Sequence, residues 1–87
     1  MARFELRFKP SVAKDLRGIP KTEVRRLLKR IEALGNDPRP AGCEQLTGRE
    51  LCRIRQGVYR IDYSVDDAAV VIEVIKVGHR REVYRAQ

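Results

Sequence analysis

Residues 50–77 contain three apolar segments that are separated by only two short turns. The turns lie at Gln56-Gly57 and at Asp66-Asp67, where glycine and aspartate favour a sharp change of direction. Connections this short join antiparallel neighbours. The pattern therefore predicts a three-stranded antiparallel sheet, against which the rest of the chain must pack. The three predicted strands cover roughly 50–56, 58–65 and 69–77.

The first half of the chain supplies one more strand and two helices. Residues 3–9 alternate between apolar and charged side chains, which is typical of a half-buried strand. A short amphipathic segment lies between Pro10 and Gly18, and a longer one, with apolar residues every three or four positions, runs from Pro20 to Gly35. The predicted order is β-α-α-β-β-β. We expect an α+β fold in which a helical hairpin packs on one face of a mainly antiparallel four-stranded sheet and leaves the other face free.

Length and composition limit the class of protein. The 87 residues suffice for one domain, which we assign to residues 1–87. Two cysteines, Cys43 and Cys52, are too few for a disulfide scaffold and lack the spacing of a zinc site. We therefore expect a reduced, cytoplasmic setting and no metal or other cofactor. No apolar segment approaches the roughly 20 residues of a membrane-spanning helix, so no membrane partner is expected.

The charge of the chain is strongly positive and is carried mainly by arginine. Nineteen basic residues against twelve acidic ones give a net charge of +7, and fourteen of the nineteen are arginine. A guanidinium is a permanent cation whose planar donors suit phosphate. Basic faces that are simply solvated are also common, and we expect one on the longer predicted helix. Whether the arginines bind phosphate therefore depends on where they lie in the fold.

Three arginines fall on one face of the predicted sheet. Arg53 and Arg55 share a face of their strand, and Arg60 lies on the same face of the next strand. Like charges this close are unfavourable unless an anion lies between them. That anion is either an external phosphate or an internal carboxylate in a salt-bridge network. The acids available for such a network are Glu5, Asp62 and Glu73.

A second cluster of polar residues follows the last predicted strand. It contains His79, Arg80, Arg81 and Tyr84, at a strand end from which side chains can reach a ligand. Together with the arginines of the sheet, it suggests a site for a phosphodiester. Arginines can stabilise charge on a phosphate but are too weakly acidic to act as bases. The proton acceptor would then be Tyr84, His79 or a group of the substrate complex.

Two segments of the chain resemble the RelE toxins of bacterial and archaeal toxin–antitoxin pairs. They are residues 52–63, CRIRQGVYRIDY, and residues 77–84, VGHRREVY. The resemblance implies the RelE-like microbial RNase fold and an mRNA interferase, an endoribonuclease that inhibits translation by cutting mRNA in the ribosomal A site. It further implies that no metal is needed, that the partners are the ribosome and mRNA, and that a RelB-like antitoxin neutralises the protein.

The resemblance also assigns roles to individual residues. Arg53 and Arg55 stand where the family has two lysines on a strand, so a cationic role carries over but a base role does not. The implied catalytic residues are Arg60, Arg80 and Tyr84, and the implied RNA-binding residues are Arg53, Arg55, His79 and Arg81.

Two other functions fit the same sequence. Toxins of the ParE branch share the fold but poison DNA gyrase and lack the nuclease residues. A module that binds RNA or a protein partner without catalysis is the third possibility. The presence of Arg60, Arg80 and Tyr84 together favours the nuclease.

Overall fold

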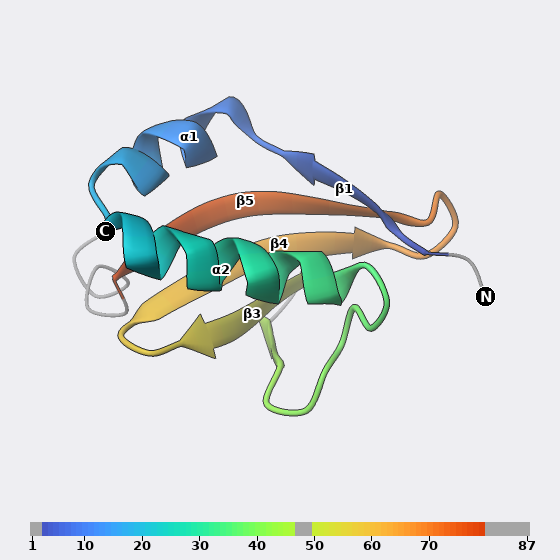
Figure 1. Ribbon diagram of the computed structural model, residues 1–87. Helices are drawn as coiled ribbons and strands as arrows, with labels where there is room; N and C mark the ends of the chain where they lie inside the picture. The colour runs from blue at the N-terminus through green and yellow to red at the C-terminus, as the bar shows by residue number, and fades with distance from the viewer. Residues whose placement is uncertain (1–2, 47–49, 80–87) are drawn as a thin grey trace.

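A computed structural model describes residues 3–46 and 50–79 of the chain, and Figure 1 shows its two layers. A pair of helices lies on one side of a twisted sheet, and the longer helix, α2, crosses the front of the sheet in this view. The described elements are β1 (Glu5–Phe8), α1 (Pro10–Arg17), α2 (Lys21–Leu34), β2 (Glu44–Leu46), β3 (Leu51–Gln56), β4 (Tyr59–Asp66) and β5 (Val71–His79).

The sheet has five strands in the order β1-β5-β4-β3-β2. The pairs β2–β3, β3–β4 and β4–β5 are antiparallel, and β1 runs parallel to β5, with Glu5 opposite Val71. The α+β class, the helical hairpin on one face and the mainly antiparallel sheet are as predicted. The count of four strands was wrong, because β2 pairs with β3 through Gln45 and Cys52. A strand of three residues is too short to show a period of two in the sequence.

The core lies between the helices and the facing side of the sheet. Alternation along β3 and β4 turns Ile54 and Ile61 toward the helices, where both are fully buried. Helix α2 contributes three buried side chains and α1 contributes one, so each amphipathic stripe has a partner. The buried apolar residues are Val12, Leu27, Ile31, Leu34, Cys52, Ile54, Ile61, Tyr63, Val65, Ile72, Val74 and Val77.

A buried tyrosine fastens the loop after α2 to the sheet. The Tyr63 hydroxyl donates a hydrogen bond of 2.7 Å to the Pro38 carbonyl and lies 3.4 Å from the Cys43 sulfur. Burial, and then the Cys43 thiol, raise the pKa of Tyr63 far above its usual value. The phenol therefore stays neutral and remains a hydrogen-bond donor that holds this loop.

Helix α1 covers the part of β5 that β1 does not reach. The pairing with β1 ends at Val74, and beyond it the Val77 amide donates a hydrogen bond of 3.2 Å to the Asp15 carboxylate. Lys76 Nζ lies 3.3 Å from the same carboxylate. Beyond the pairing with β1, this amide of β5 would have no strand partner, and the Asp15 side chain of α1 accepts its hydrogen bond instead. This contact fixes the helix beside the end of β5, where the predicted cluster begins.

The described helices are all short by the standard of a lipid bilayer. Across residues 3–46 and 50–79, none has both the length and the apolar composition that crossing a membrane requires.

Candidate active site

The three arginines of the sheet lie on the face that points away from the helices. In the register of β3 and β4, Arg55 stands opposite Arg60, and Arg53 stands opposite Asp62. Directly opposed residues of an antiparallel pair project to the same side. These four residues, Arg53, Arg55, Arg60 and Asp62, are called the arginine face below. The shared face of the three arginines is therefore as the alternation predicted.

Asp62 is the internal anion of this face. It accepts two hydrogen bonds from the Arg53 guanidinium, 2.7 Å from Nε to Oδ1 and 3.2 Å from Nη2 to Oδ2. Both side chains are about 15% exposed, so the pair is largely shielded from water. Of the three acids that the sequence offered, Glu5 instead pairs with Arg7 at 2.8 Å on the surface of β1. The salt-bridge alternative is thus correct for Arg53.

Arg60 is the most unusual residue on the arginine face. It is only 3% exposed, and it is the one buried charged residue of the described part of the chain. Its Nε lies 3.9 Å from Asp62 Oδ2, beyond hydrogen-bonding distance. Within residues 3–46 and 50–79, Nε and Nη1 have no hydrogen-bond partner. A buried cation with open donors is unfavourable unless an anion binds it, so this position suits a phosphate.

Arg55 has a partner that sequence reasoning missed. Its Nε lies 3.4 Å from the Glu44 carboxylate of β2, and both side chains are more than half exposed. Glu44 lies in β2, outside every strand that the sequence predicted, so no pattern placed it beside β3. An exposed pair of this kind contributes little to stability, and Arg55 remains open to exchange its partner for another anion.

His79 is not brought together with the arginines, contrary to our expectation. Strand β5 continues through His79, which stands opposite Tyr59, while Gly78 stands opposite Arg60. His79 therefore projects toward the helices, on the side opposite to Arg60. Its ring contacts the Tyr59 ring edge-on, with 6.0 Å between centroids. The two rings line a small cavity of about 250 Å³ together with Asp15 of α1.

Three predicted site residues, Arg80, Arg81 and Tyr84, lie outside the described residues. Of the predicted set, the structure therefore brings together Arg53, Arg55 and Arg60. Across the described ranges, no three histidine, cysteine, aspartate or glutamate side chains gather where they could hold a metal ion.

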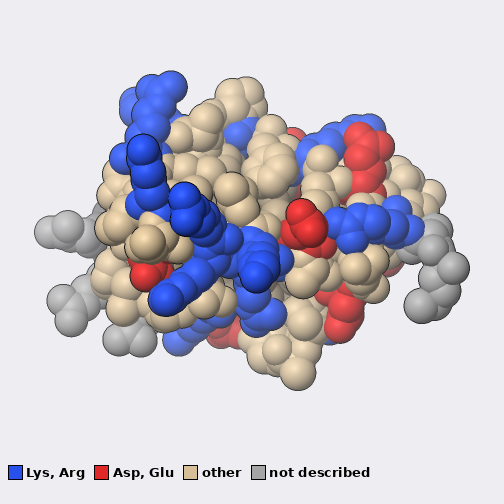
Figure 2. Space-filling model, viewed as in Figure 1, with Lys and Arg blue, Asp and Glu red and all other residues tan. Residues whose placement is uncertain are grey.

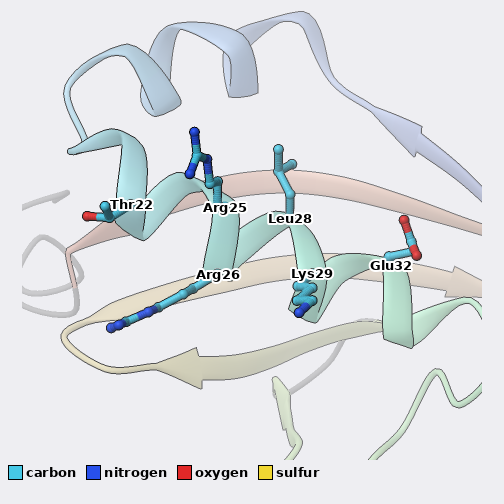
Figure 3. Close-up of a pocket in the computed structure, with 6 residues that line it drawn as sticks. All are labelled: Thr22, Arg25, Arg26, Leu28, Lys29 and Glu32. Carbon is cyan, nitrogen blue, oxygen red and sulfur yellow. The ribbon is translucent and has the colours of Figure 1, made fainter.

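A second candidate surface lies on the helical side of the molecule. Lysine and arginine side chains gather there over α1 and α2, with few acidic side chains among them (Figure 2). A groove of about 580 Å³ runs along the outer face of α2, and Leu28 forms an apolar part of it (Figure 3). Leu28 is 41% exposed and lies among the basic side chains that line this groove. The groove is lined by Thr22, Arg25, Arg26, Leu28, Lys29 and Glu32.

A neighbouring groove lies between the two helices. It is lined by Leu16 and Ile19 from the α1 side and by Val24 of α2, and Arg25 borders both grooves. The two grooves together combine an apolar floor with a basic rim. Sequence reasoning favoured a solvated face for these basic residues and did not foresee the exposed leucine between them.

The comparisons with known proteins agree with this architecture. Residues 6–84 match the family model described as ParE toxin of the type II toxin–antitoxin system parDE. No curated protein sequence matches the chain significantly. The fold is similar to that of the RelBE2 toxin–antitoxin complex from Mycobacterium tuberculosis, with a TM-score of 0.79, 22% identity, and coverage of 90% of this chain and 99% of that one.

Two further solved structures are closer in sequence. The archaeal RelE–RelB complex from Pyrococcus horikoshii OT3 contains a chain with 31% identity and a TM-score of 0.77, covering 90% of this chain and 96% of that one. A doubly substituted E. coli RelE toxin in the free state has 32% identity and a TM-score of 0.78, covering 98% and 93%. The matched family model and these similarities extend over the sheet, the helical hairpin and the arginine face. The chain is therefore a RelE-type toxin of a type II toxin–antitoxin system, within the RelE/ParE superfamily.

Proposed function

We propose that this toxin is a metal-independent endoribonuclease that cuts mRNA in the A site of the ribosome and so inhibits translation. The observation that carries the proposal is Arg60, a buried guanidinium whose Nε and Nη1 have no hydrogen-bond partner within the described residues. A protein keeps such a group at a cost in stability, and such costs are concentrated at functional sites. The proposed target places the protein in the cytoplasm, together with the ribosomes.

The proposed reaction is an attack by a ribose 2′-hydroxyl on the adjacent phosphate. The new bond joins the 2′-oxygen to phosphorus, the bond to the 5′-oxygen of the next nucleotide breaks, and a 2′,3′-cyclic phosphate remains. Arg60 and Arg80 would stabilise the charge that grows on the phosphate oxygens, and Arg53, Arg55 and Arg81 would hold the RNA backbone. The hydroxyl proton must leave, and the leaving oxygen must gain one.

The proton transfers are assigned to Tyr84. Arginine cannot act as a base near neutral pH, which excludes Arg53 and Arg55 from that role. His79 projects to the helical side of the sheet, away from Arg60, so it is not a candidate partner of the same phosphate. His79 could contact RNA only if the substrate extends around the end of β5, from the face that carries Arg60 to the face that carries the helices.

The proposal predicts cleavage of mRNA on ribosomes and little cleavage of the same RNA alone. The ribosome would hold the 2′-hydroxyl in line with the scissile bond, and positioning of this kind lowers a barrier by several kcal/mol, up to about 7–11. The measurement is toeprinting of a defined mRNA in programmed ribosomes, with wild type beside Arg80→Ala. Cleavage should persist after zinc and manganese are chelated with magnesium held constant.

The match to the ParE family model favours one other function, poisoning of DNA gyrase. Supercoiling assays with purified gyrase test it directly. Gyrase-dependent DNA breakage without RNA cleavage would select this function and reject the nuclease. Absence of both activities, with RNA or partner binding retained, would select a non-catalytic module.

An antitoxin is the proposed protein partner, and the basic grooves of the helical side are its proposed docking surface. The related chains from P. horikoshii and M. tuberculosis were solved in complexes with antitoxins. An exposed leucine surrounded by basic side chains suits an acidic amphipathic segment of a RelB-like antitoxin. Because the rim is basic, the association rate and the affinity for an acidic segment should both fall as the salt concentration rises.

Replacing Leu28 with glutamate should weaken antitoxin binding by about 10- to 100-fold. The substitution removes one apolar contact, which contributes about 1.5–3 kcal/mol when fully buried. It also places a carboxylate against an acidic partner. The measurement is titration calorimetry with the purified antitoxin. Val58→Glu is the matched control, because Val58 is 45% exposed at the β3–β4 turn, outside both grooves. Equal weakening by both variants would contradict this docking surface.

A further inference from the structure

The arginine face already holds an anion, and the position of that anion bears on which RNA the site accepts. The Asp62 carboxylate is bound by Arg53 through hydrogen bonds of 2.7 and 3.2 Å, and its Oδ2 lies 3.9 Å from Arg60 Nε. A carboxylate between two guanidiniums occupies the kind of place that a phosphate takes, because both anions present paired oxygens to the same fork of donors.

We propose that Asp62 is a specificity-determining residue that competes with RNA phosphate for Arg53 and Arg60, an inference that rests on the function proposed above. A phosphate that engages both guanidiniums has to displace the carboxylate and break its charge-assisted hydrogen bonds. Free RNA must offset the free energy of displacing Asp62 through its own contacts with the protein. RNA that a ribosome already holds in position loses less translational and rotational entropy on binding, so the same displacement reduces its affinity less. Asp62 thereby disfavours unpositioned RNA.

The geometry around Asp62 differs from that of an ordinary surface ion pair. Arg39 and Asp67 also form a two-pronged pair, at 3.2 and 3.0 Å, but their side chains are 47% and 64% exposed. The Arg53–Asp62 pair is largely buried. Nε and Nη1 of Arg60 have no hydrogen-bond partner within the described residues, although Asp62 Oδ2 lies 3.9 Å from Nε. A carboxylate with only a neutralising role would be expected to satisfy those donors.

Asp62→Asn tests the competition directly. The probe is a short RNA with 2′-O-methyl groups, which cannot be cut by 2′-hydroxyl attack, and binding is followed by fluorescence anisotropy over a range of KCl concentrations. We expect about tenfold tighter binding, because one charge-assisted competitor is removed. The slope of log affinity against log salt should steepen by about 0.7 for each added phosphate contact.

Asp67→Asn is the matched control. It makes the same change in net charge and breaks an ion pair of the same two-pronged form, on the turn after β4. We expect a change in RNA affinity of about twofold or less, as for exposed pairs elsewhere. An equal gain in both variants would overturn the proposal, since net charge would then explain it. Unchanged or weaker binding by Asp62→Asn would overturn it as well.

A second pair of variants covers the case in which Asp62→Asn does not fold, as judged by circular dichroism. In Arg53→Met, Asp62 still lies beside Arg60, so the added Asp62→Asn change should again tighten binding. Equal or weaker binding by the double variant would overturn the proposal. Cleavage on ribosomes is measured in parallel. Tighter binding by Asp62→Asn, with no cleavage by the wild type, would support the competition while rejecting the nuclease.

Discussion

Replacing Arg60 with methionine should reduce the single-turnover rate of RNA cleavage by about 10²–10³-fold, the usual cost of losing one preorganised donor. The same substitution should not lower the free energy of unfolding and is expected to raise it, because methionine fills a similar volume without a buried charge, while Asp62 keeps its two hydrogen bonds to Arg53. Arg60 is 3% exposed, and its Nε and Nη1 have no hydrogen-bond partner within the described residues. The measurements are cleavage on programmed ribosomes and thermal unfolding by circular dichroism, where each kcal/mol shifts the midpoint by about 4–8 °C.

Arg55→Met provides the comparison on the same face. Arg55 is exposed and pairs with Glu44 at 3.4 Å, so its loss should change the free energy of unfolding by about 0.5 kcal/mol or less. A gain in stability for Arg60→Met alone would identify Arg60 as a residue kept for function at a cost to the fold. Strong destabilisation by Arg60→Met would instead assign it a structural role, and the proposed phosphate site would lose its main support.

Tyr84→Phe should reduce the rate of the chemical step by about 10²–10⁴-fold, whereas His79→Ala should leave it close to wild type. Phenylalanine keeps the aromatic surface and removes the oxygen that would handle the proton, and general acid–base catalysis is typically of this size. The resemblance to RelE toxins assigns the essential tyrosine to position 84. His79 lies against Tyr59 on the helical side of the sheet. Single-turnover kinetics on ribosomes separates this effect from changes in binding.

Tyr59→Phe is the control for the loss of a phenol oxygen. Its ring packs against His79 and the core, on the side of the sheet opposite to Arg60, so cleavage should not change. A rate near wild type for Tyr84→Phe would exclude Tyr84 as acid or base. In that case a group of the ribosome would have to move the proton, while a large loss in His79→Ala would contradict the exclusion of His79 by its position on the helical side of the sheet.

The sequence was sufficient to predict the hairpins and the shared face of the arginines. Both follow from local rules, since short connections, of two residues between β3 and β4 and four between β4 and β5, favour antiparallel pairing, and alternation then assigns each side chain to a face. These two rules were enough to place Arg53, Arg55 and Arg60 on one face of the sheet. Strand β2 could not be predicted, because its three residues join the sheet through pairing with β3 rather than through any pattern of their own.

His79 illustrates a second kind of limit. The sequence placed the end of the last strand at residue 77, but β5 continues to His79, so alternation decides where that ring points. The alternation itself is interrupted, since the register with β4 shifts between Asp62 and Tyr63. Val74 and Val77 are both buried although they are three residues apart. A bulge of this kind reverses the assignment of faces, and only the structure locates it.

The parallel pairing of β1 with β5 sets the order in which the molecule can fold. Glu5 pairs with Val71, so the backbone of β1 gains this partner only after β5 has been synthesised. Contacts this distant in the chain form late, because closing a long loop costs entropy before any contact is gained. The β3–β4–β5 meander can form from local turns, whereas the pairing of β1 with β5 has to close a loop that contains both helices. The complete sheet can therefore form only after β5 has been synthesised, and a product that is truncated before residue 71 would lack the partner of β1.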